Sequence, residues 1–143
     1  MAEFKLVISD PKSGRTMQKE VKDNAARAFL NKKIGENVSG DSFELNGYEF
    51  TITGGSDKSG FPMRKGILFP RKKVLAEKGS VGFRGTNRKK VVRRIVKKKT
   101  VCGERVSDSI SQINLKVTKQ GAAVLFEEKK EEAKEKAAEE KKE

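Results

Sequence analysis

The chemistry that this sequence favours is the binding of phosphate by a dense group of Lys and Arg side chains. Residues 58–105 carry seventeen bases and two acids, a net charge of +15, whereas the whole chain of 143 residues carries +13. A cationic surface that serves only solubility usually has acids interspersed among its bases, and residues 79–99 contain no acid. The segment therefore predicts binding to a polyanion, RNA or DNA, with release of condensed cations.

The predicted RNA-binding residues are these bases together with one aromatic residue: Lys58, Phe61, Arg64, Lys65, Arg71, Lys72, Lys73, Arg84, Arg88, Lys89, Lys90, Arg93, Arg94, Lys97, Lys98, Lys99 and Arg105. Arg can donate two hydrogen bonds to one phosphate, while Lys acts as a point charge. The mixture suits folded RNA, which is recognised by backbone and shape. The only aromatic residues in the segment are Phe61, Phe69 and Phe83. This argues against a stacking platform for single strands and leaves double-stranded RNA and folded junctions.

The most unusual string in the segment is GGSDKSGFPM, residues 54–63. Gly55 and Gly60 have the spacing of a phosphate-binding loop, but Phe61 stands where that loop requires Lys. Nucleotide hydrolysis is therefore disfavoured. The string predicts a glycine-rich turn between strands, with a phosphate-contacting loop as the alternative. In that alternative Lys58 and Arg64 touch phosphate, and Phe61 stacks on a base or fills the core.

The sequence offers little else for catalysis. It contains no His and a single cysteine, Cys102, and no Ser has an evident base partner. Asp57 and Asp108 each lie near a turn, where a carboxylate commonly accepts backbone N–H bonds. We expect no enzyme activity, metal or cofactor. We also expect no secretion signal and no membrane span. The single cysteine points to a reducing compartment, so the protein is expected to be cytosolic or nuclear.

The elements that position these residues are mostly predicted strands. Alternation predicts a hairpin of residues 4–8 and 17–21 and a strand at residues 113–117. A helix is expected over residues 24–33, capped by Asp23 and ending near Gly35. Asn46-Gly47 predicts a type I′ hairpin between residues 43–45 and 48–52, closed by Gly54-Gly55.

The basic segment itself is harder to interpret. Residues 67–69 and 74–75 are candidate strands separated by Pro70 and three bases, and residues 79–90 are expected to form a cationic loop. Residues 91–101 fit either a helix face or a β-branched strand. After Gly121 the chain is expected to turn and return over residues 124–126.

Together these elements predict a mainly β fold, a small β-barrel with one short helix and basic extended segments. Residues 1–126 are expected to form one RNA-binding domain, with a basic extension over about 58–105. Residues 127–143 contain only Glu, Lys and Ala, which predicts a solvated, charged helical tail.

Three stretches carry a resemblance to a known family. The string GGSDKSGFPMRKG at residues 54–66 resembles the signature loop of the archaeal and eukaryotic small-subunit ribosomal proteins of the e-type S-six family. The opening FKLVISDPKSGR followed by QKEV, and KKKTVCGERVSDSISQINLKVTKQG at residues 97–121, are similar to other parts of that family. The resemblance covers about residues 4–121. The tail has no Ser or Thr, so the regulatory serines of eukaryotic members are not expected, and the short form resembles the archaeal one.

The resemblance implies a structural constituent of the small ribosomal subunit that binds and stabilises folded ribosomal RNA in the cytoplasm. Its expected partners are that RNA and neighbouring ribosomal proteins, with no membrane and no small-molecule substrate. The alternatives are a general DNA- or RNA-coating basic protein outside the ribosome and, less favoured, a nucleotide-hydrolysing enzyme.

Overall fold

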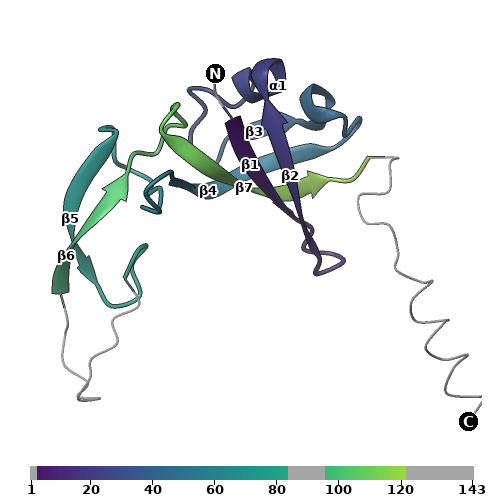
Figure 1. The fold of residues 1–143 in the computed structure, drawn as a ribbon. Helices are drawn as coiled ribbons and strands as arrows, with labels where there is room; N and C mark the ends of the chain where they lie inside the picture. Colours follow the sequence, from purple (N-terminus) through teal and green to yellow (C-terminus); the bar gives the residue numbers. More distant parts are fainter. Residues whose placement is uncertain (1–2, 84–95, 122–143) are drawn as a thin grey trace, which may run out of the picture.

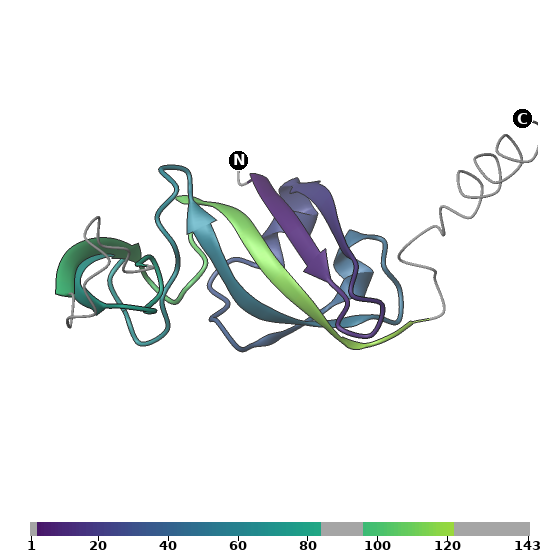
Figure 2. The ribbon, with the colours of Figure 1, turned by 90° about the horizontal axis from the view of Figure 1, so that it is seen from below.

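The computed structural model describes residues 3–83 and 96–121, and these residues are mainly β (Figure 1). The elements are β1 (Glu3–Ser9), β2 (Thr16–Lys22), α1 (Asp23–Arg27), β3 (Asn37–Ser39), the 3-10 helix η1 (Gly40–Phe43), β4 (Glu49–Asp57), β5 (Arg71–Glu77), β6 (Val96–Cys102) and β7 (Ile110–Lys119). The five-stranded sheet has the order β2-β1-β7-β4-β3, and β5 and β6 form a separate two-stranded ribbon. The prediction of a mainly β fold with one short α-helix is confirmed. The sheet curls as an open half-barrel, whose edges are β2 and β3 (Figure 2).

The hairpin of β1 and β2 follows from the alternation at the start of the chain. Phe4, Leu6 and Ile8 point to one face and are buried, because successive side chains of a strand lie on opposite faces. The two strands pair antiparallel, with Phe4 opposite Val21 and Ile8 opposite Met17. This predicted hairpin is confirmed.

Strand β7 lies at the centre of the sheet. It pairs parallel with β1 and antiparallel with β4, and its Ile113, Leu115 and Val117 are buried in the core, as the sequence predicts. Strand β4 continues through Gly54 and Gly55 to Asp57, so the expectation that these glycines close a hairpin is wrong. At Gly55 a Cβ atom would lie 2.3 Å from the backbone oxygen of Gln112. Only glycine allows the two strands to approach this closely.

Helix α1 is shorter than predicted. It begins at Asp23, with Lys22 as its N-cap and no side-chain capping bond, and ends at Arg27. After Arg27 the N–H groups of Phe29 and Leu30 bond to carbonyls three residues back, as in a tight turn, and a distant partner takes over at Asn31. Asn31 takes a left-handed φ of 64° and donates its N–H to the carbonyl of Val106.

The predicted type I′ hairpin at Asn46-Gly47 is wrong. Strand β4 pairs instead with β3, and η1 follows β3 directly. The N–H of Tyr48 bonds to the carbonyl of Leu45, and of the two central residues only Gly47 has a positive φ. This is the pattern of a type II turn, not of type I′, which needs positive φ at both central residues.

The ribbon of β5 and β6 projects from the end of the sheet at which β4 ends and β7 begins (Figures 1 and 2). The bases 71–73, expected to connect two strands, lie inside β5, and residues 67–69 form no strand. Of the ambiguous segment 91–101, the described residues belong to strand β6. Residues 84–95 and 122–143, including the predicted return over 124–126 and the charged tail, lie outside the described residues. In the described ranges, no helix has the length and apolar character to cross a membrane.

Candidate nucleic-acid interface

The glycine-rich string at residues 54–63 forms a tight reversal at the end of β4. Ser56 and Pro62 pair as an isolated antiparallel bridge, and Gly60 takes a φ of 80°. The backbone N–H groups of residues 57–60 all have acceptors within the protein, namely Phe61 O, Ser109 O, Asp57 Oδ1 and Asp57 O. A phosphate-binding loop needs such N–H groups to point at its ligand. The geometry therefore favours the predicted turn between strands over a phosphate cradle.

The reversal is held by Asp57, whose side chain is only 1% exposed. Its Oδ1 accepts the N–H of Ser59 at 2.7 Å, as expected for a carboxylate near a turn, and its Oδ2 accepts Arg71 Nε at 2.6 Å. Burial raises the pKa of this carboxyl, but the bonds from Ser59 and Arg71 outweigh burial, and the pKa lies below its usual value. Arg71 also donates to Ser59 Oγ at 3.0 Å. The ion pair joins the end of β4 to the start of β5, so it ties the ribbon to the sheet.

Two further side chains complete this junction. The Cys102 thiol lies 3.4 Å from Asp57 Oδ2, and burial, followed by the neighbouring carboxylate, raises its pKa to about 11. Phe61 packs partly buried against the core, and the Arg71 guanidinium lies 5.3 Å from its ring centroid. Of the two predicted roles for Phe61, filling the core is the one that the geometry favours. Arg71 and Phe61 therefore hold the ribbon in place.

The ribbon brings two separate basic runs of the sequence together. Residues 71–73 lie on β5 and residues 97–99 on β6, with Lys73 opposite Thr100 and Leu75 opposite Lys98. Since side chains alternate between faces, Lys73 and Lys98 lie diagonally on one face, while Lys72, Lys97 and Lys99 belong to the other. The two strands contain six bases and one acid, Glu77. Both faces of the ribbon are therefore cationic.

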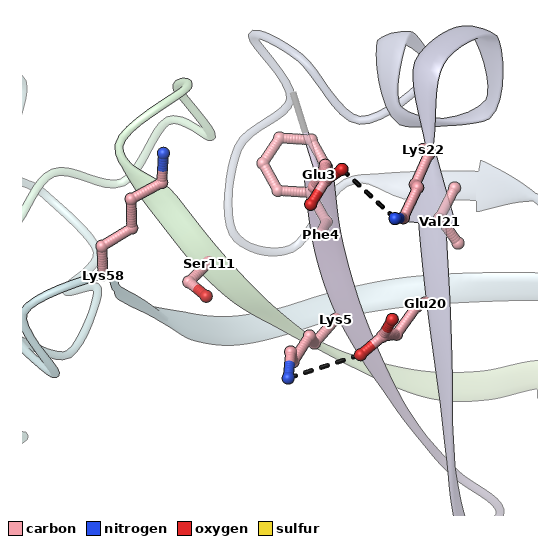
Figure 3. Close-up of a pocket in the computed structure, with 8 residues that line it drawn as sticks. All are labelled: Glu3, Phe4, Lys5, Glu20, Val21, Lys22, Lys58 and Ser111. Atoms are coloured by element: carbon pink, nitrogen blue, oxygen red, sulfur yellow. Dashed lines mark ion pairs between the residues drawn. The ribbon is translucent and has the colours of Figure 1, made fainter. Parts of the chain in front are cut away.

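These ribbon cations differ from the bases of the sheet in their partners. In the sheet Lys5 pairs with Glu20, Lys22 with Glu3, Lys19 with Glu44 and Lys119 with Glu49, and in the connection before β3 Lys32 pairs with Glu36. Figure 3 shows the first two pairs crossing between β1 and β2, with Lys58 and Ser111 on the other side of the same pocket. Among residues 3–83 and 96–121, Arg71 is the only base of the segment 58–105 that makes an ion pair. The fold thus neutralises most lysines of the sheet locally and, apart from Arg71, leaves the described bases of the basic segment without an ion pair.

The remaining predicted residues occupy the junction or lie outside the described ranges. Lys58 and Lys65 are exposed beside the reversal, and the N–H of Arg64 bonds to Cys102 O. Arg105 is exposed and follows Cys102 by three residues, in a bridge with Lys33. The predicted residues Arg84, Arg88, Lys89, Lys90, Arg93 and Arg94 lie outside the described ranges.

Sequence reasoning missed a group of exposed apolar side chains on the ribbon and beside it. They are Leu68, Phe69, Leu75, Val81 and Val96, and they are the exposed large apolar residues of the described chain. Phe69 and Leu75 were expected in short candidate strands. A usable signal was present, because each of these residues stands among bases and glycines, without the sustained apolar alternation of β1 or β7. Exposed apolar groups collected in one region indicate a binding surface.

The chain is similar over most of its length to known proteins of one family. The model of the family described as ribosomal protein S6e matches residues 4–129. Among curated proteins, the small ribosomal subunit protein eS6 of Archaeoglobus fulgidus is 43% identical over 126 residues, covering 87% of this chain and 94% of the relative. The proteins of the same name from Halorubrum lacusprofundi and Thermoplasma volcanium are 41% and 39% identical, covering 82% and 90% of this chain and 83% and 96% of the relatives. The resemblance noted from three short strings thus extends over most of the chain. The chain belongs to the ribosomal protein S6e family.

Proposed function

We propose that this protein is a structural constituent of the small ribosomal subunit and that its β5–β6 ribbon braces folded ribosomal RNA. Family membership supports the ribosomal role. The observation that carries the RNA-binding part is the charge distribution. Within the described residues the ribbon's lysines make no ion pair, whereas Lys5, Lys19, Lys22 and Lys119 of the sheet each pair with a glutamate. Unpaired Lys and Arg side chains near phosphate release condensed cations, which supplies most of the sequence-independent affinity for nucleic acid.

In this proposal some residues contact the RNA and others position the ribbon. Exposed bases contact phosphate, and they include Lys65, Lys72, Lys73, Lys97 and Lys98. Asp57 and Arg71 orient the ribbon, because their ion pair connects β4 to β5. Contacts to phosphate from a rigid ribbon fix register and orientation without reading sequence.

The basic residues after the ribbon strand β5, the domain as a whole and the charged C-terminal residues also have proposed roles. The bases among residues 84–94 contribute to RNA binding, residues 1–126 act as one RNA-binding unit, and residues 127–143 are a charged tail that is not needed for binding. The protein is a constituent of the ribosome and not an enzyme, with small-subunit RNA and neighbouring ribosomal proteins as its partners.

Sedimentation of cell extract tests the ribosomal role, and the expected result is that the protein travels with small subunits. Competition between a small-subunit RNA fragment and duplex DNA of equal length then tests the RNA preference. Equal competition by the DNA would favour a general nucleic-acid coat. Titration with ATP and magnesium addresses the enzyme alternative, where binding heat would count against the proposal.

A further inference from the structure

A groove runs beside β5 on the ribbon. It has a volume of about 450 Å³ and is lined by residues 64–69 and by three residues of β5. Among the described strands β5 pairs only with β6, so its other edge has no strand partner there. Leu68, Phe69 and Leu75 line the groove and are 76%, 63% and 66% exposed. The groove therefore presents apolar surface that the described residues leave uncovered.

The same groove also carries positive charge. Arg64, Lys65 and Lys72 line it, and no acidic residue does. Lys72 Nζ lies 5.8 Å from the Phe69 ring centroid, which places a cation beside the exposed aromatic ring. Arg64 Nη1 is buried and is the one buried side-chain nitrogen or oxygen in the described ranges that lacks a hydrogen-bond partner. A buried donor without an acceptor is costly, and the cost is recovered when a ligand supplies the acceptor.

We propose that this groove binds one unpaired nucleotide of the RNA, with its base against Phe69 and its phosphate on Arg64, Lys65 and Lys72. This inference rests on the proposed function and specifies which RNA feature the ribbon recognises. An unpaired base is flat and apolar on its faces and is attached to an anion, so it matches an aromatic ring and aliphatic walls with cations at the rim.

Two other occupants fit less well. A regular duplex keeps its bases stacked inside the helix, so it offers the groove phosphate but nothing for Phe69, Leu68 and Leu75. An acidic peptide with an apolar side chain offers both features. It would, however, compete for Lys65 and Lys72 with the RNA that the adjacent cations of the ribbon attract, because those cations have no acid partners in the described chain.

The test uses the full-length protein and two hairpin RNAs that differ by a single bulged 2-aminopurine nucleotide. The wild-type protein should bind the bulged hairpin about tenfold more tightly than the fully paired one, the magnitude expected for one base stacked on one aromatic ring. Binding should also change the 2-aminopurine fluorescence. Phe69→Ala should abolish the preference, and Phe69→Tyr should retain it. Lys73→Gln, which removes a ribbon charge outside the groove, should weaken binding to both RNAs equally.

Each outcome decides the matter. If the wild type binds the two hairpins equally, the groove does not bind an unpaired nucleotide, while RNA binding by the ribbon still stands. If it binds neither hairpin, both proposals are refuted. A photo-crosslinking phenylalanine at position 69, in small subunits, provides the second measurement, with the same group at position 98 as its control. Crosslinks from position 69 to an unpaired nucleotide support the proposal. Crosslinks from 69 to a protein or to paired nucleotides overturn it, even where position 98 crosslinks to RNA.

Discussion

The charge distribution makes a quantitative prediction about salt dependence. Lys73 and Lys98 lie diagonally on one face of the ribbon, and neither pairs with an acid in the described chain. If each contacts one phosphate, the double variant Lys73→Gln with Lys98→Gln loses two contacts. Each contact contributes about 0.9 to the slope of log affinity against log salt, so the slope should fall in magnitude by about 1.8. Between about 50 and 200 mM salt, the wild-type affinity should then drop about 12-fold more than that of the variant.

The matched control removes two lysines that the fold already neutralises. Lys5 lies 3.3 Å from Glu20, and Lys22 lies 3.3 Å from Glu3 (Figure 3). The double variant Lys5→Gln with Lys22→Gln changes the net charge by the same amount, and its slope should match that of the wild type. Fluorescence anisotropy with a labelled small-subunit RNA fragment measures all three slopes, and circular dichroism checks that each variant is folded. If the two double variants lower the slope equally, affinity follows net charge alone, and the assignment of RNA contact to the ribbon is refuted.

Three further predictions concern the junction between sheet and ribbon. Asp57→Asn should lower the free energy of unfolding by about 2 kcal/mol at neutral pH, because it removes the charged partner of Arg71. Arg71 is half-exposed, so water can hydrate its guanidinium in the variant and limit the loss. The pKa of Asp57 is lowered in the fold, so this stability is present above about pH 4 and is lost as pH falls through the folded pKa. Denaturation of both proteins should therefore show the difference narrowing in acid, and a constant difference would argue against the ion pair. Gly55→Ala should cost about 3 kcal/mol or more because its Cβ meets backbone, while Gly54→Ala, with no atom within 4 Å, should change stability by less than about 0.5 kcal/mol. The Cys102 thiol, buried and with a pKa of about 11, should react with a thiol reagent at pH 8 only as fast as the protein unfolds, and rapid labelling of the folded protein would contradict its position.

The parts of the fold that the sequence predicted correctly are those governed by local alternation. In β1 and in residues 113–117 of β7 the buried residues stand at every second position, and β2 alternates between exposed and partly or fully buried residues. The period alone therefore determines which face enters the core. The predictions that failed were those decided by distant partners. Asn46-Gly47 carries the local signal of a hairpin, but the strand before β4 that pairs with it is β3, which ends at Ser39 and is separated from β4 by η1 and the turn. The helix after Lys22 ended early because Asn31 pairs with Val106.

By itself, the sequence determined the charge of this protein and the place of that charge along the chain, because composition needs no folding to be read. It also carried the strings by which the family is recognised. Only the tertiary structure decided which bases are free to bind. The spacing of Lys5 and Lys98 in the sequence does not reveal that one is paired and the other is not, since ion pairs depend on which strands become neighbours. The same is true of Asp57 and Arg71, fourteen residues apart, and of the groove beside β5, whose walls meet only after the ribbon has formed.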